Sequence, residues 1–378
     1  MRHNRATKTT ILIAITLILL STASLGKSQN SRISYQLLNQ PEGNITYELN
    51  VAIPEYLHEY YEEKSHRLTS SNGFSIFVTP YALQPLADRL WEIYRDEEDY
   101  ANGVLMIAHQ IRYVETAPAK YPVETMVDAQ GDCDLFSFIA ASIMKAGGLD
   151  VVLLYYEEQN HMNIGVHLSS APEDARDSVY YFTQDSERYY VAECTGGNWK
   201  AGWRVGECPT DLKQVSAEIV TLEDAQQVAP GQVSASFKAM EPSVLYLEVS
   251  PIISIQNSAI AIGGQLSPEI VNENVTLYSQ TNSSPWTVIG TALTQSDGRF
   301  EYVWMPEVAG SHAIRAGWSG NDLYTGAMSS TKSATVIPLF LTALISVVVI
   351  AAVIGAVAVF IARRTQHQSL EPPETQPW

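Results

Sequence analysis

The chain has 378 residues, and 41 acidic against 23 basic side chains give it a formal net charge of −18 at pH 7. This length allows two or three domains with apolar cores of their own. The surplus of negative charge excludes nucleic acid or an anionic membrane surface as the main partner, because both would repel the chain. The sequence has three cysteines, without Cys-x-x-Cys or His-x-x-x-His spacing, and therefore indicates neither a zinc site nor any other cofactor.

The first 26 residues have the composition of a secretion signal. Arg2, Arg5 and Lys8 precede an apolar run over residues 11–20, and small residues follow at 24–26. This order is typical of export signals. Because the apolar run is short, it favours a cleaved signal peptide over the alternative, an uncleaved N-terminal anchor.

A second apolar segment, residues 336–362, contains no charged side chain. Its length is sufficient to cross a bilayer with some tilt. Arg363 and Arg364 follow directly, so the positive-inside rule places the tail, residues 363–378, in the cytoplasm. We therefore expect a single-pass protein of the cell membrane, with residues 27–332 on the extracytoplasmic side.

The segment after the signal reads as scaffold. Two strands are predicted within residues 31–52, on either side of a turn at Pro41, and a helical region within residues 82–111. Asn102 and Gly103 are expected to break this helical region in two. The histidines of this part are expected to be surface or packing residues: His58, His66 and His109.

A cysteine is predicted at the beginning of a buried helix. Gly131 permits a tight turn, Asp132 is a suitable N-cap, and apolar residues recur at helical spacing over residues 133–145 before a glycine pair at 147–148. Cys133 would then lie at the positive end of the helix dipole, where a thiol loses its proton most easily. The alternative is a structural cysteine, so a nearby base is needed to decide.

Strands follow this helix. Residues 149–156 form a nearly continuous apolar run, and alternating segments follow at 161–168 and 189–195. A helix followed by successive strands predicts an α+β layer, with an antiparallel sheet packed on the helix. His161 would lie at one end of its strand, and Glu193 on a neighbouring strand within reach of it.

A second histidine competes for the role of base. His167 shares strand parity with His161. It lies deeper along the strand, farther from the end at which the helix should begin. We therefore favour His161.

Three segments together resemble the transglutaminase-like cysteine enzyme superfamily. They are Gly-Asp-Cys-Asp at 131–134, His-Met-Asn-Ile-Gly-Val at 161–166, and Tyr-Tyr-Val-Ala-Glu-Cys-Thr at 189–195. In that family a cysteine begins a helix, a histidine begins the next strand, and an acid on a third element orients the histidine. The resemblance extends over roughly residues 51–210 and is greatest to membrane-anchored prokaryotic members.

The resemblance implies a catalytic triad of Cys133 as nucleophile, His161 as base and Glu193 as orienting carboxylate. Glutamate stands where aspartate is more usual. It also implies a transglutaminase-like, papain-like domain over residues 27–230, made of helices and an antiparallel sheet. The substrate would be a protein or peptide amide, which the thiolate attacks and which hydrolysis or acyl transfer to an amine then releases. The alternative is a catalytically inactive surface protein that uses the same fold for binding or adhesion.

The remaining cysteines flank a glycine- and tryptophan-rich loop. Cys194 and Cys208 are close in sequence and can form a short disulfide, which would leave Cys133 as the free thiol. Two interpretations of the loop stay open for Trp199 and Trp203. They wall a peptide groove near the nucleophile, or they cover the edge of the core.

From about residue 240 the pattern is purely β. Short alternating runs are separated by turn residues, and they occur at 245–249, 275–278, 286–289, 300–304 and 312–318. Their spacing resembles bacterial immunoglobulin-like modules, so a β-sandwich is expected over residues 240–333. A stalk that lifts the catalytic domain from the membrane is its simplest role. Asparagines in glycosylation sequons are found at Asn44, Asn274 and Asn282.

Overall fold

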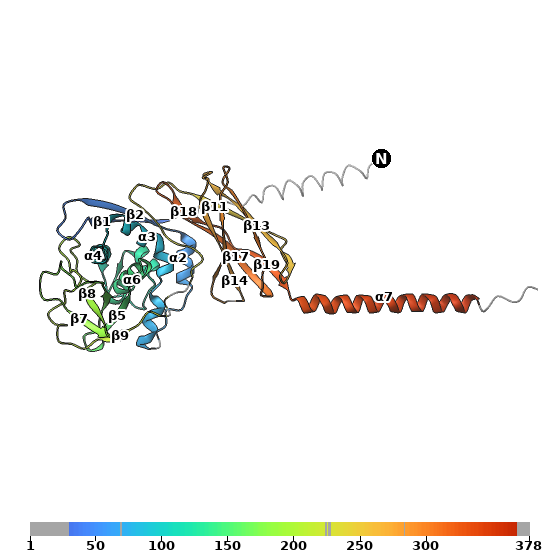
Figure 1. The fold of residues 1–378 in the computed structure, drawn as a ribbon, viewed down its shortest axis with the longest axis horizontal. Helices are drawn as coiled ribbons and strands as arrows, with labels where there is room; N and C mark the ends of the chain where they lie inside the picture. Colours follow the sequence, from blue (N-terminus) through green and yellow to red (C-terminus); the bar gives the residue numbers. More distant parts are fainter. Residues whose placement is uncertain (1–29, 69, 224, 226–227, 283, 369–378) are drawn as a thin grey trace, which may run out of the picture.

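The computed structural model describes most of the chain, namely residues 30–68, 70–223, 225, 228–282 and 284–368. The predicted signal peptide and the last ten residues of the predicted tail lie outside the described residues. The fold is α+β. Figure 1 shows a first part in which helices surround a sheet, a second part made of strands, and a long C-terminal helix that projects away from both.

The first part contains both helices and strands. In chain order they are β1 (Ser31–Leu38), β2 (Thr46–Ile53), α2 (Glu55–Glu62), η1 (Ser71–Phe77), α3 (Pro80–Ile93), α4 (Glu97–Ala108), β3 (Arg112–Tyr113), α5 (Pro122–Asp128), β4 (Gln130–Gly131), α6 (Cys133–Ala146), β5 (Val151–Tyr156), η2 (Glu157–Gln159), β6 (His161–His167), β7 (Tyr181–Gln184), β8 (Glu187–Ala192), β9 (Glu218–Val220) and β10 (Ser234–Ser236).

The central sheet has the order β7-β8-β6-β5-β9, and its neighbouring strands are antiparallel. Helix α6 packs against one face of this sheet. Apolar residues on all sides of the helix are buried, and they share a core with Met162, Ile164 and Val166 of β6. A smaller apolar cluster, which includes Val152 and Val191, covers the opposite face. The predicted order of one helix followed by an antiparallel sheet is therefore present.

The break in the predicted helical region of residues 82–111 was placed wrongly. The region divides between α3 and α4, where Asp96 accepts a hydrogen bond from Asp99 N at 2.9 Å and caps α4. Asn102 and Gly103 lie inside α4. A side chain at Gly103 would collide with the ring of Tyr94, so this glycine is needed for close packing and does not end the helix.

The second part is formed by strands β11 (Val244–Ser250), β12 (Ile253–Ile255), β13 (Ile260–Ser267), β14 (Asn274–Thr281), β15 (Thr287–Leu293), β16 (Arg299–Trp304), β17 (Gly310–Gly320), β18 (Thr325–Met328) and β19 (Lys332–Ile337). One sheet has the order β11-β13-β16 and the other β12-β19-β17-β14-β15, with β18 paired to β17. Both contribute to one apolar core. Each of the five predicted runs overlaps a strand.

The two parts contact each other through polar and aromatic groups. Tyr81 on α3 and Tyr278 on β14 share a hydrogen bond between their hydroxyls at 2.9 Å. Arg89 on α3 forms an ion pair of 2.7 Å with Asp322. These contacts place α3 beside the second part, and α2 also lies against it, since Arg315 on β17 is 5.6 Å from the ring centre of Tyr56.

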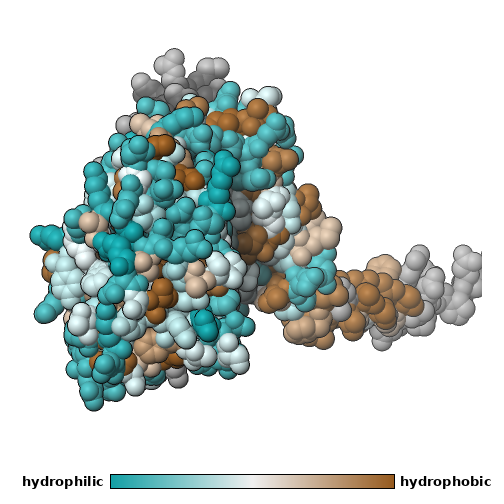
Figure 2. All heavy atoms as spheres, turned by 60° about the vertical axis from the view of Figure 1, so that its left-hand side comes forward, coloured by the Kyte–Doolittle hydropathy of each residue, from teal (hydrophilic) through white to brown (hydrophobic). Residues whose placement is uncertain are grey.

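The last helix, α7, runs from Leu339 to Gln368 and begins after Pro338. The expected start of a membrane-spanning helix at Val336 is therefore wrong, because Val336 belongs to β19 and is buried in the core of the second part. Hydrophobic residues gather along α7, whereas the face of the first part seen in Figure 2 is mostly hydrophilic. Of the helices in the described part of the chain, none satisfies both the length and the hydropathy expected of a membrane span.

Candidate active site

Cys133 is the first residue of α6. Asp132 occupies the N-cap position with extended backbone, but its carboxylate does not cap the helix. Its Oδ2 instead accepts a hydrogen bond from Thr116 N at 2.7 Å, while its carbonyl accepts the first bond of the helix from Phe136 N at 3.0 Å. Cys133 is 9% exposed and is a free thiol. Its sulfur therefore lies at a helix N-terminus with limited access from solvent.

A buried serine ties this first turn to the sheet. Ser137 Oγ lies 2.7 Å from Cys133 O and 3.2 Å from Met162 O. Ser137 thus connects α6 with β6 beside Cys133 and His161. Sequence reasoning did not single out Ser137, because a serine inside an apolar helix has no distinctive pattern.

His161 is the first residue of β6 and lies at the strand end where α6 begins. The preceding residue, Asn160, has a left-handed conformation with φ 46°, and its carbonyl accepts the Cys133 S–H at 3.9 Å. His161 Nε2 donates to Glu193 Oε2 at 2.9 Å. Since Nε2 is occupied, Nδ1 is the ring nitrogen left to interact with the Cys133 sulfur.

Glu193 follows β8 and is fully buried. Besides His161, it accepts bonds from Asn163 Nδ2 at 3.1 Å, from Thr195 N at 2.8 Å and from Thr195 Oγ1 at 2.6 Å. Both carboxylate oxygens are therefore satisfied, which is what a buried charge requires. The pairing of Ile164 with Ala192 in the β6–β8 ladder brings these groups together.

Strand parity explains where the three predicted residues meet. Met162 and Ile164 pack on the α6 side of the sheet, whereas His161 and Asn163 have the opposite parity. The site is accordingly built at the open end of β6 and not across the face of the sheet. Cys133, His161 and Glu193 are brought together there.

The His161–Glu193 pair is strongly polarised. Burial lowers the pKa of His161, but its interactions with Cys133 and Glu193 outweigh this and raise the pKa from 6.5 to about 10. Burial raises the pKa of Glu193, yet the hydrogen bond from His161 and those from Thr195 leave it below its usual value. The pair therefore favours an imidazolium beside a carboxylate at neutral pH.

His167 lies outside this site. It ends β6, six residues from His161, which corresponds to roughly 20 Å along an extended strand. Its Nδ1 donates to Arg188 O at 3.1 Å.

His109 has a position that the sequence did not indicate. It is buried, and its Nε2 donates to the backbone carbonyl of Glu193 at 3.0 Å. Burial lowers the pKa of His109 and so favours its neutral form, whereas the pKa of His161 is raised. Gly202 lies directly against His109 and leaves no room for a side chain. His109 thus fixes the backbone that carries the acid.

The residues beside the cysteine form an acidic pair. Burial and the neighbouring Asp132 raise the pKa of Asp134 to about 8. Asp132 Oδ1 is buried without a hydrogen-bond partner among the described residues. The raised pKa favours the protonated form of Asp134, which would limit the negative charge close to Cys133. Among the residues described, no group of three or more His, Cys, Asp and Glu side chains is arranged to hold a metal ion.

The predicted disulfide between Cys194 and Cys208 is wrong, because both are free thiols. Cys194 belongs to the core on the α6 side of the sheet, whereas Cys208 belongs to the cluster on the opposite face. Their proximity in sequence misled the prediction, since the loop between them crosses the sheet edge. Burial raises the pKa of both thiols, that of Cys208 to about 11.

We therefore expect a reducing agent to leave the melting temperature of the native chain unchanged. A disulfide of this loop length would contribute about 3 kcal/mol, which reduction would remove. The measurement is thermal unfolding by circular dichroism with and without dithiothreitol. A fall of several degrees on reduction would show that the two thiols are joined.

The two tryptophans of the loop differ in environment. Trp199 packs against the main core. Trp203 lines a cavity of about 270 Å³ together with Arg176 and Asn198. Trp199 therefore covers the edge of the core, as the second interpretation expects. Trp203 lines a cavity, and none of the residues that line it is Cys133.

Thr195→Val is expected to weaken the site without disturbing its shape. The substitution removes the hydroxyl bond to Glu193 Oε1, which is a bond to a buried charge, and should cost about 1–3 kcal/mol of stability. The rate of Cys133 modification should fall as well, because His161 depends on this carboxylate. Thr183→Val, at an exposed position of β7, is the matched control. If both variants have the same stability and the same labelling rate, the hydroxyl of Thr195 does not support Glu193.

No protein-family model and no curated protein matches the sequence. Among solved structures, one chain that it resembles is described as "Structural basis of T cell specificity and activation by the bacterial superantigen toxic shock syndrome toxin-1", with 14% identity, 25% of this chain and 99% of that chain covered, and a TM-score of 0.21. Another, "Marsupial T cell receptor", has 9% identity, 25% and 51% coverage, and a TM-score of 0.20. Likenesses at these TM-scores assign neither a fold nor a function to this chain.

Proposed function

We propose that this chain is a transglutaminase-like cysteine enzyme that acts on protein or peptide amides. The observation that carries the proposal is the fully buried Glu193 bonded to His161, whose ring interacts with the free thiol of Cys133 at a helix N-terminus. A buried carboxylate with four hydrogen bonds, one of them to a histidine beside a thiol, is typical of nucleophilic cysteine sites.

The reaction would begin with attack of the Cys133 sulfur on the amide carbon. His161 holds the proton that the sulfur gives up, and a C–S bond forms as the carbonyl oxygen becomes an oxyanion. The backbone N–H of Cys133, which has no acceptor within the helix, supports this charge. His161 then gives the proton to the leaving amine as the C–N bond breaks, and a thioester remains.

The second half of the reaction releases the acyl group. Water or an amine attacks the thioester while His161 accepts a proton, and the thiol returns as the C–S bond breaks. Glu193 keeps the imidazole ring in one orientation and stabilises its charged form throughout. Hydrolysis and acyl transfer proceed through the same thioester. The product therefore depends on whether water or an amine reaches it first.

The proposal includes the surroundings of the enzyme. Residues 1–26 would export the chain, α7 would anchor it in the cell membrane, and the second part, with an immunoglobulin-like sandwich, would act as the stalk. This part of the proposal rests on the apolar and basic residues of the sequence.

The experiment is product analysis on a peptide library. The full chain is incubated with the library in the presence and absence of a primary amine, and products are identified by mass spectrometry. We expect cleaved or deamidated peptides without amine, amine adducts if transfer competes, and neither with Cys133→Ala. A library left unchanged by a chain whose Cys133 reacts readily with electrophiles would favour a binding protein that retains the fold.

A further inference from the structure

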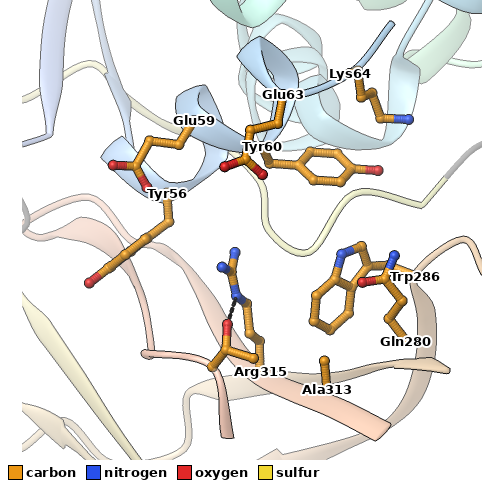
Figure 3. A pocket seen from close by; sticks show the side chains of 10 residues that line it. Tyr56, Glu59, Tyr60, Glu63, Lys64, Gln280, Trp286, Ala313 and Arg315 are labelled. Atoms are coloured by element: carbon orange, nitrogen blue, oxygen red, sulfur yellow. Dashed lines mark hydrogen bonds between the residues drawn. The ribbon is translucent and has the colours of Figure 1, made fainter. Parts of the chain in front are cut away.

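A cavity of about 350 Å³ lies between α2 and the strands of the second part (Figure 3). It is distant in sequence from the candidate active site. Its wall combines aromatic rings with charged groups of both signs, among them Tyr56, Glu59, Tyr60, Glu63, Trp286 and Arg315.

Arg315 on β17 supplies a half-buried positive charge. Its guanidinium lies 5.6 Å from the ring centres of both Tyr56 and Trp286, and its Nε donates to Thr331 Oγ1 at 2.6 Å. Among the described residues no carboxylate lies within ion-pair distance of it. Figure 3 shows the two terminal nitrogens pointing into the cavity. Burial lowers the pKa of this group, although the nearby Tyr56, Glu59 and Glu63 oppose the shift.

Two carboxylates face the same space from the opposite side. Glu59 lies within α2 and Glu63 one helical turn later, at its C-cap; the Glu63 carboxylate lies above the Arg315 guanidinium, and Glu59 extends towards Tyr56 (Figure 3). In the described part of the chain, neither side chain forms a hydrogen bond or an ion pair. Arg315 and these two exposed carboxylates therefore line the same cavity without a direct ion pair between them.

The charge pattern selects one class of ligand. A simple anion would face Glu59 and Glu63, a simple cation would face Arg315, and a neutral polyol would leave the guanidinium without a counter-charge. A ligand with a carboxylate and an ammonium group satisfies both sides. Arginine binds carboxylates through two parallel bonds, and an ammonium is stabilised by carboxylates together with aromatic faces.

We infer that this cavity binds the zwitterionic head of a free α-amino acid. The carboxylate of the ligand lies on the Arg315 fork, and its ammonium lies against Glu59 and Glu63 beside the ring of Tyr56. The ligand side chain extends towards Tyr60 and Gln280, where the cavity has room. Lys64 already lies over the Tyr60 ring, 5.0 Å from its centre. This inference is independent of the proposed enzymatic function.

The test measures binding of the free amino acids, one at a time, to the purified full chain by isothermal titration calorimetry. The best ligand is compared with its methyl ester, which lacks the carboxylate, and with its N-acetyl derivative, which lacks the ammonium. Each derivative should bind at least about tenfold more weakly, because each loses a charge-assisted contact. Cys133→Ala should bind the amino acid as the native chain does.

Variants locate the site. Arg315→Lys keeps the charge but loses the fork and should weaken binding about tenfold, and the Glu59→Gln, Glu63→Gln double variant should do the same. Glu62→Gln is the matched control, since Glu62 is on the same helix but pairs with His58 outside the cavity. Because the positions of the double variant are exposed, its fold should be retained even where Arg315→Lys is unstable.

Three results would overturn the inference. One is the absence of binding by every amino acid at millimolar concentration. Another is equal binding of the methyl ester or the N-acetyl derivative. The last is unchanged affinity in the Glu59→Gln, Glu63→Gln variant, which would place any bound amino acid elsewhere.

Discussion

Iodoacetamide should modify Cys133 in the native chain and leave Cys194 and Cys208 untouched. Cys133 lies beside His161, whose raised pKa favours a charged ring next to the sulfur, whereas burial raises the pKa of the other two thiols. The thiolate is the reactive species, so the three rates should differ by orders of magnitude. Mass spectrometry of tryptic peptides after brief labelling measures them.

Cys133→Ala should then abolish both labelling and any turnover of peptide substrates. We expect the loss of turnover to reach about 10⁴-fold or more, as for other nucleophiles that act through a histidine. His161→Ala should retain slow labelling, because the helix N-terminus still favours the thiolate, but should not turn over substrate. Labelling of Cys194 or Cys208 ahead of Cys133 would argue against an active thiol and in favour of the inactive binding protein.

The parts of the site that could be predicted from sequence are those fixed by local pattern. A glycine and an aspartate before an apolar run of helical spacing locate Cys133 at a helix start, and a strand that begins at His161 locates the ring. Both inferences need only neighbouring residues. Glu193 was placed through its order in the chain, and the β6–β8 ladder supplies the physical reason.

The remainder depends on tertiary contacts that no local pattern encodes. Ser137, Asn163 and Thr195 are ordinary polar residues until the packing of α6 on β6, and of β8 beside it, brings them to the cysteine and the acid. His109 contacts a carbonyl that is 84 residues away in sequence. Assigning these residues to the site requires knowledge of which distant segments are in contact.

Errors arose where sequence distance or glycine suggested the wrong geometry. Cys194 and Cys208 are neighbours in the chain but face opposite sides of the sheet. Gly103 resembles a helix break but allows Tyr94 to pack, and strand β13, which contains a pair of glycines, was not among the predicted runs. At Gly264 a side chain would collide with Tyr246 O, so close approach of strands β11 and β13 explains the residue.

Glu193→Gln should shift the titration of His161 and with it the pH dependence of stability. Without the carboxylate, only the interactions with Cys133 still oppose burial of the ring, so the pKa of His161 should fall below about 10. The ring should lose its proton at a lower pH than in the native chain, and labelling of Cys133 at pH 8 should be slower. Two-dimensional NMR of the histidine ring signals follows the titration directly.

The change in stability has a defined pH window. A histidine whose pKa is raised on folding stabilises the fold fully below its unfolded pKa of about 6.5, and this contribution is lost as the pH rises through about 10. The lowered pKa of Glu193 acts in the opposite sense, since its contribution is present above about 4.5 and is lost as the pH falls through the folded value. The free energy of unfolding of the native chain should therefore exceed that of Glu193→Gln by the most between about pH 4.5 and 6.5, by about 3 kcal/mol, as for a buried pair that loses one partner.

Glu187→Gln provides the matched control for this measurement. Glu187 lies 3.6 Å from His167 on the same sheet, but Glu187 is exposed and His167 only half-buried, so their pair should contribute little at any pH. Chemical denaturation of the three proteins from pH 4 to pH 10 gives the comparison. If the difference between the native chain and Glu193→Gln does not change with pH, Glu193 contributes packing and hydrogen bonds to the core, and the group that orients His161 must be another residue.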